Sequence, residues 1–244
     1  YPMGVCCVQY GQKVIAISPR RFLQDNIVFY NIADHHFGSR VDLLLLKEIS
    51  IPDNRYLGRF GYVLVKHKPL SSKVEDFVVI EFQTGQTTST GHLVQALEDF
   101  MQGKAIQDES YGFGLNLADI WKRTFTQILT KGIALENWGR KIYWVIQEPI
   151  YQDFLDRYKL HGMSYERHHS TIFAIYDLQR AREQYELCQT RLESSTINDL
   201  FQAFRTNLEV PPKEVFVARL EKEIRKQTGA KLQMRLDVNE SDLT

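Results

Sequence analysis

The chain has 244 residues, enough for one large domain or for a domain with a small appendage. A hydrophobic fraction of 43% predicts a globular protein with a substantial core, and no apolar run approaches the roughly 20 residues of a membrane span. The formal net charge is zero, which weighs mildly against a nucleic-acid-binding protein, although charge can segregate onto one face.

The first part of the chain reads as helices alternating with strands. The predicted elements are, in order, a strand at 14–17, a helix at 20–37, strands at 41–51, 60–67 and 76–84, and a helix at 91–101. Turn signals at Pro52-Asp53-Asn54 and at Pro69 separate the three long strands. We therefore expect these strands to form an antiparallel meander.

The second part is richer in helical patterns. The predicted elements are helices at 115–130 and 150–158, strands at 141–147 and 171–178, helices at 180–192, 197–205 and 213–226, and a short strand at 232–238. Together these patterns predict an α/β protein in which helices flank a mixed sheet, followed by a mostly helical C-terminal part.

The strand at 76–84 carries polar side chains where apolar ones would be expected. Because side chains alternate along a strand, Phe77, Val79, Glu81 and Gln83 share one face. A buried carboxylate without a partner is costly, and a metal ion or a cationic group would remove that cost. Glu-x-Gln at the end of a strand therefore indicates a metal-dependent nuclease site, whereas two solvent-facing edge residues are the plainer alternative.

Several segments, in the same order, resemble the NotI-type restriction endonucleases, a branch of the PD-(D/E)XK nucleases. The matching segments are Gly4-Val5-Cys6, Ser18-Pro19-Arg20-Arg21-Phe22, Phe37-Gly38, Glu48 before Ile51-Pro52, Gly58 to Leu64, Asp76 to Thr88, and Trp121 to Gly132. The resemblance runs from residue 4 to about residue 147 and is loose in the last hundred residues.

The resemblance implies a restriction-endonuclease-like core and the hydrolysis of double-stranded DNA at a defined palindrome. It implies Mg2+ as the metal, a homodimer, and a cognate DNA methyltransferase in the same system. We expect an N-terminal segment at 1–40, a nuclease core at 41–180, and a helical C-terminal part at 181–244 that packs on the core. A cytoplasmic location is expected, because three cysteines give no disulfide framework.

The resemblance also implies a catalytic set in which one member is missing. Glu48 and Glu81 match the metal-binding acids, and Gln83 matches the residue that assists the attacking water. The family pattern places an Asp before the apolar residues of the middle strand, but Gly61 stands there. We hypothesise that Gly61 disables this copy. Strand alternation turns Asp76 away from Glu81, so Asp76 would replace the missing acid only if a bulge reversed its face.

The N-terminal segment departs from the family pattern as well. Family members resemble one another in a metal-bound cysteine cluster there, and Cys6 matches one ligand, whereas Ser18 stands where another cysteine is expected. Four ligands make a closed structural site and one or two do not, so we expect no metal at this position.

Candidate DNA contacts are basic or hydroxyl side chains near the matching segments: Arg20, Arg21, Thr87, Thr88, Lys122 and Arg123. Each has a plainer interpretation. The basic residues, and Lys131 with them, can form the solvated face of a helix, and the threonines can cap the helix that follows. The histidine pairs at 35–36 and 168–169 are expected to be plain surface residues.

Two other classes of function stay open. One is a non-catalytic, sequence-specific DNA-binding protein on a degenerate nuclease fold, which the missing acid favours. The other is a metal-dependent nuclease that acts on RNA or branched DNA, which the neutral overall charge permits.

Overall fold

The computed structural model describes residues 6–53, 56–106, 109–160, 162–182, 184–207 and 211–227. Contacts divide the chain into two compact units, Tyr1–Asn207 and Leu208–Thr244. In the second unit, α7 (Lys213–Gln227) carries ion pairs along its surface, such as Arg219 with Glu223 at 2.8 Å. The strand predicted at 232–238 lies outside the described residues. Within the described parts of the chain, no helix has both the length and the apolar composition needed to cross a membrane.

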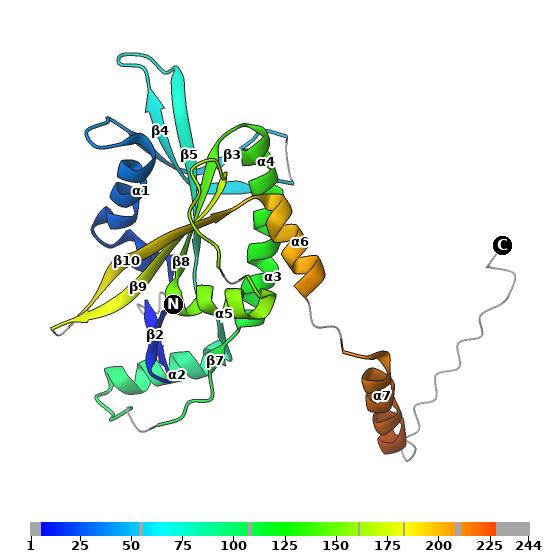
Figure 1. Cartoon of the computed structure of the whole chain (residues 1–244). Helices are drawn as coiled ribbons and strands as arrows, with labels where there is room; N and C mark the ends of the chain where they lie inside the picture. Colours follow the sequence, from blue (N-terminus) through cyan, green and yellow to red (C-terminus); the bar gives the residue numbers. More distant parts are fainter. Residues whose placement is uncertain are drawn as a thin grey trace, which may run out of the picture. The chain divides into compact units, whose positions relative to one another are not determined.

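A six-stranded mixed sheet forms the centre of the first unit (Figure 1). Its order is β10-β9-β8-β5-β4-β3. The strands are β3 (Leu44–Ser50), β4 (Arg59–His67), β5 (Val74–Gln83), β8 (Lys141–Gln147), β9 (Thr171–Ala181) and β10 (Gln184–Ser195). β5 pairs in parallel with β8, and β8 with β9, whereas the other neighbours are antiparallel. This arrangement confirms the predicted mixed sheet and the meander of β3, β4 and β5.

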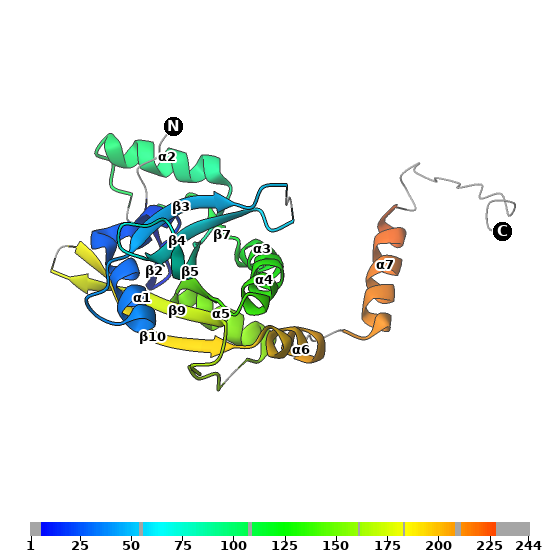
Figure 2. The same ribbon diagram turned by 90° about the horizontal axis from the view of Figure 1, so that it is seen from above.

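Helices cover both faces of the sheet (Figure 2). On one face, α1 (Ile27–Phe37) and the 3₁₀ segment Pro19–Asn26 pack on the even-numbered side chains of β5, such as Val78 and Ile80. The helices α3 (Leu117–Gln127), α4 (Ile133–Asn137), α5 (Glu148–Tyr158) and α6 (Ile197–Asn207) lie on the other face. The structure thus confirms the α/β architecture.

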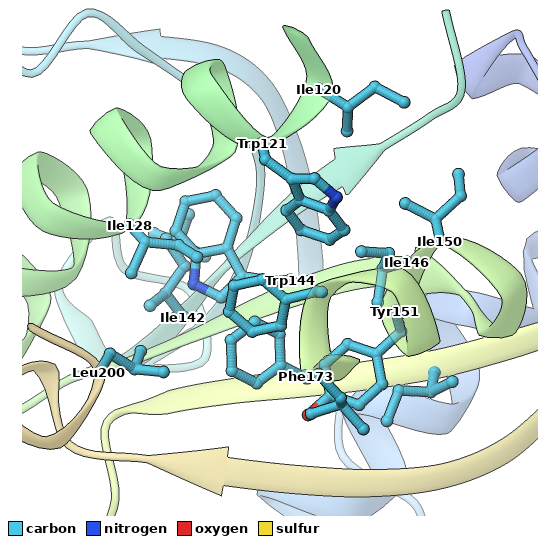
Figure 3. Close-up of a cluster of buried hydrophobic side chains, with 14 of the residues drawn as sticks. Ile120, Trp121, Ile128, Ile142, Trp144, Ile146, Ile150, Tyr151, Phe173 and Leu200 are labelled. Carbon is cyan, nitrogen blue, oxygen red and sulfur yellow. The ribbon is translucent and has the colours of Figure 1, made fainter. Parts of the chain in front are cut away.

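The core on the side of α3 to α6 is built around aromatic side chains (Figure 3). Trp144 of β8 and Phe173 of β9 are fully buried, and Tyr151 lies with its ring centroid 5.2 Å from that of Phe173. Trp121 stacks on Phe154 at 4.7 Å, and its indole N–H donates to Asp153 at 2.7 Å. Apolar burial of this extent is the main favourable term in folding, so this core fixes α3 and the segment after it against β5.

The helix predicted at 180–192 is wrong, because these residues form the end of β9 and most of β10. The segment is rich in Arg, Gln and Glu, which favour helices in isolation. In the fold it is the edge strand of a hairpin with β9, and it buries Leu187 while its polar side chains face outward. Strand pairing has overridden the local preference.

Two other predicted helices are interrupted. The first, at 20–37, breaks at Asp25 and Asn26, which adopt left-handed φ values of 50° and 56°, before α1 begins. The second, at 115–130, becomes a π-helical turn at Ile128–Gly132 between α3 and α4. π-helical turns occur often at functional sites, and the one here carries Lys131.

Smaller elements sit around the ends of the sheet. β1 (Cys7–Tyr10) and β2 (Lys13–Ala16) form a hairpin, and β6 (Thr87–Thr88) pairs with β7 (Gly114–Leu115). The predicted helix at 91–101 is present as α2 (Thr90–Met101). Gly85 donates its N–H to Ala16 O at 2.8 Å, and a Cβ at this position would lie 2.9 Å from Ile15 Cγ2. Glycine therefore allows β2 to approach the chain directly after β5.

The histidines of α1 are not the plain surface residues that the sequence suggested. His35 Nδ1 lies 2.8 Å from Tyr143 Oη, and His36 Nε2 lies 3.0 Å from Asp76 Oδ2. Burial lowers the pKa of His35. Burial also lowers the pKa of His36, although the hydrogen bond to Asp76 opposes that change.

We expect acid to destabilise the fold through these two histidines. Because their folded pKa values lie below the ordinary 6.5, the unfolded chain takes up protons first as the pH falls through that value. Their contribution is complete above 6.5 and is lost below it. The melting temperature should drop between about pH 7.5 and about pH 5.5, and the drop should shrink in a His35→Gln/His36→Gln variant. His92 is exposed, so His92→Gln should leave the size of that drop unchanged.

Candidate active site

Three neighbouring strands bring the predicted acidic positions into one row. Lys47 pairs with Tyr62 and Ile49 with Phe60, so Glu48 of β3 stands opposite Gly61 of β4. Tyr62 pairs with Ile80, so Gly61 in turn stands opposite Glu81 of β5. The backbone positions of 48, 61 and 81 therefore lie side by side, although the first and the last are 33 positions apart in the sequence.

Glu81 is buried, with 7% of its surface exposed, and has two nitrogen donors. Its Oε1 accepts from Lys131 Nζ at 2.6 Å and from the Gly61 N–H at 3.1 Å. Lys131 reaches it from the π-helical turn and also donates to Arg59 O at 2.6 Å. The cost of burying this carboxylate is thus offset by a buried ammonium group and a backbone N–H.

Gly61 lies directly beside that carboxylate, at a distance that leaves little room for a Cβ. A Cβ at position 61 would lie 3.3 Å from Glu81 Oε2 and 3.4 Å from Ile80 O. A side chain at this position would therefore start next to Glu81, on the same face of the sheet. The position at which the family resemblance implies an acid therefore faces Glu81.

Gln83 is buried and tied to α3. Thr124 Oγ1 donates to Gln83 Oε1 at 2.8 Å, and Gln83 Nε2 donates to Gln127 Oε1 at 3.2 Å. Gln83 shares the face of Glu81, as the strand alternation predicted. Both ends of its amide are engaged with α3, so this side chain connects the strand end to the helix that leads to Lys131.

Glu48 lies in the same row, but its carboxylate turns outward. The residue has a φ of 52°, a left-handed conformation that interrupts β3, and its side chain is 72% exposed. The carboxylate pairs with Arg59 Nη1 at 3.1 Å. Burial and the negative charge of Glu48 raise the pKa of Tyr62.

Asp76 does not replace the missing acid. It lies near the other end of β5, where its carboxylate contacts His36 and lies 3.4 Å from Arg140 Nε. The expected alternation of faces holds, and Asp76 has partners of its own.

The residues present do not fit a divalent ion of the Mg2+ type. Such an ion prefers several oxygen ligands, commonly from one or two carboxylates and from substrate phosphates. In the row described above, Oε1 of Glu81 is already engaged by Lys131 and the Gly61 N–H, Glu48 points toward Arg59, and position 61 offers no side chain.

The comparison with family models identifies the family of the chain. The model described as restriction endonuclease NotI matches residues 5–188, more than half of the chain. The chain belongs to the NotI restriction endonuclease family. The comparison with curated proteins gave no match. Membership makes the protein one of a family of type II restriction endonucleases, which are nucleases that bind DNA and generally use divalent metal.

The NotI-family match includes the predicted DNA contacts, which lie in three places. Lys122 and Arg123 are exposed on α3, and Arg20 is exposed in the 3₁₀ segment. Arg21 is half-buried, and its guanidinium donates to Tyr185 O of β10. Thr87 and Thr88 form β6, where Thr88 Oγ1 accepts from the Gly114 N–H at 3.1 Å. These sites are separate segments, and Arg21 and Thr88 already have partners within the fold.

The NotI-family cysteine pattern maps onto the hairpin of β1 and β2. Ser18 N donates to Cys6 O at 3.3 Å, so the two positions at which the family pattern places cysteines are neighbours. The Ser18 hydroxyl accepts from Arg20 N and caps the 3₁₀ segment. Burial raises the pKa of the neighbouring Cys7 thiol.

Sequence reasoning missed Lys131, which was grouped with the solvated charges of a helix. The available signal was its place next to Gly132, at the end of the matching segment 121–132. Gly132 allows α6 to approach closely, because a Cβ there would collide with Ile197 Cδ1. The second histidine pair also has a partner that was not foreseen, since Glu166 lies 3.4 Å from His168 and 3.9 Å from His169.

The two glycines of the site predict opposite responses to a methyl group. Gly61→Ala should change the free energy of unfolding by no more than about 1 kcal/mol, because its Cβ would lie 3.3 Å from Glu81 Oε2, so only a small shift is needed, and glycine in a strand is itself unfavourable. Gly132→Ala should destabilise the fold by about 1–3 kcal/mol, because its Cβ would collide with the buried side chain of Ile197, which must then repack. Urea unfolding of both variants measures this difference, and equal effects would contradict the packing described here.

Proposed function

We propose that this protein is a NotI-type, site-specific type II restriction endonuclease in which Gly61 has replaced the catalytic acid. The observation that carries the proposal is the row of Glu48, Gly61 and Glu81, in which the glycine faces the buried carboxylate at close range. In this proposal the chain as it stands binds double-stranded DNA without cutting it. We assign the nuclease core to residues 41–195 and not to the expected 41–180, because β10 (Gln184–Ser195) belongs to the central sheet.

An acid at position 61 would complete a site for Mg2+. The new side chain would begin at a Cβ that lies 3.3 Å from Glu81 Oε2. Glu48 can turn toward the row, since its side chain is exposed. In the Gly61→Asp variant, a bound metal would supply the activated water and would neutralise charge on the phosphate. Carboxylates at positions 48, 61 and 81 of that variant would hold the ion, and Gln83 fixes the end of β5 against α3.

The remaining parts of the proposal concern partners. A palindromic site has twofold symmetry, which a homodimer matches by placing one active site on each strand. A cognate methyltransferase would protect the host DNA at the same site. Arg20, Lys122 and Arg123 are the exposed basic side chains assigned to phosphate contacts. A cytoplasmic location follows from this role.

Restoring the acid tests the proposal. Gly61→Asp should convert unmethylated, high-molecular-weight genomic DNA into discrete fragments in the presence of Mg2+, whereas the original chain should leave it intact. Gly61→Asn is the matched control, because it has nearly the same shape without the charge and should not cleave. Glu81→Gln in the Gly61→Asp background should abolish the fragments.

Each other outcome decides against part of the proposal. Discrete fragments from the original chain would show that Gly61 is not disabling. Sequence-specific binding without cleavage by Gly61→Asp would favour the non-catalytic DNA-binding protein. The hydrogen bonds that Lys131 and the Gly61 N–H donate to Glu81 also favour that alternative. Cleavage of RNA or branched DNA alone would favour the third class of function.

A further inference from the structure

The site around Glu81 already contains a cation. Lys131 and Glu81 form an ion pair at 2.6 Å in which the side chains are 6% and 10% exposed, respectively. Pairs with this little exposure are uncommon for Lys and Glu, which are almost never fully buried unless paired. Lys131 Nζ also lies 5.6 Å from the centroid of the Phe60 ring, so protein surrounds it on several sides.

Each charged group of this ion pair also makes a hydrogen bond to the backbone of β4. The ammonium donates to Glu81 Oε1 and to Arg59 O, and the same carboxylate oxygen accepts from the Gly61 N–H. The charges of Lys131 and Glu81 cancel without a metal ion. Both residues that flank the pair in β4, Arg59 and Gly61, contribute backbone groups rather than acidic side chains.

We propose that Lys131 is the resident cation of this site and holds the position next to Glu81 that a divalent ion needs. This inference takes from the proposed function only that Glu81 is the metal position. The chain then folds and closes its site without metal. A divalent ion can reach Glu81 Oε1 only when the Lys131 side chain withdraws.

Gly61 and Lys131 are coupled in this picture. With glycine at position 61, one buried carboxylate faces one ammonium, and the balance favours Lys131. An aspartate at position 61 adds a second negative charge beside Glu81, and two adjacent carboxylates attract a divalent ion more strongly than one does. Lys131 still repels that ion, because like charges at close range oppose each other.

Metal binding without DNA tests the inference. Mn2+ serves as the probe, and its binding is measured by the loss of the free-ion electron paramagnetic resonance signal. The original chain and its Glu81→Gln variant should bind the same amount of Mn2+, because Glu81 of the original chain does not take up the ion. The melting temperature of the original chain should be the same in Mn2+ and in EDTA. Gly61→Asp/Lys131→Met should bind Mn2+ at least about tenfold more tightly than Gly61→Asp alone.

Lys104→Met supplies the matched control. Lys104 forms an ion pair with Asp99 at 2.6 Å, but its side chain is 56% exposed and it belongs to a different part of the fold. In the Gly61→Asp background it should leave the Mn2+ affinity unchanged. A Lys131 variant that binds no more tightly than this control would overturn the inference.

The original chain decides the matter even if the Lys131 variant fails to fold. Binding of Mn2+ by that chain, lost in Glu81→Gln, would show that Lys131 does not hold the cation position. Failure of both Gly61→Asp variants to bind Mn2+ would also overturn the inference. These readouts contain no DNA, so a Gly61→Asp protein that binds Mn2+ as expected but does not cut DNA would refute the proposed function and leave the role of Lys131 intact.

Discussion

The buried contact between Lys131 and Glu81 connects the parts of the fold on which the site depends. It joins the end of β5 to the segment between α3 and α4, and through Arg59 O and the Gly61 N–H it also includes β4. Breaking a buried ion pair by removing one partner generally costs about 3–5 kcal/mol, because the other charge stays buried. A π-helical turn, a close contact between α6 and Gly132, and an aromatic core under α3 together hold Lys131 at this point.

The order of the strands explains why a site forms around Glu81, near the end of β5. An antiparallel meander sets β3, β4 and β5 in register, and β8 then pairs in parallel with β5. Glu81 of β5 has position 61 of β4 on one side and the buried Trp144 of β8 on the other. The apolar strand therefore excludes water on one side of Glu81, while the meander supplies polar positions on the other side. That combination strengthens any charge interaction at Glu81.

The sequence predicts much of this arrangement, for identifiable reasons. Period-two alternation placed Glu81 and Gln83 on one face, and the turn signals at Pro52 and Pro69 separated the strands correctly. The role of Lys131 was beyond local reasoning, since a lysine on an amphipathic pattern is usually solvated and only the tertiary fold brings it to β5. The edge strand β10 was missed for the related reason that its Arg, Gln and Glu residues favour a helix until β9 is present to pair with them.

The ion pair also changes how the persistence of Glu81 should be understood. Glu81 and Gln83 next to an absent acid can be taken as the remains of a recently active site, since drift would otherwise remove them. The structure gives both residues a second reason to stay: Glu81 neutralises a buried lysine, and Gln83 binds Thr124 and Gln127 of α3. Their presence therefore carries less weight for activity than the geometry of position 61 does. With glycine at position 61, the Lys131–Glu81 pair can stabilise the fold whether or not the chain cleaves DNA. Only a substitution at position 61 therefore tests whether the chain is a nuclease.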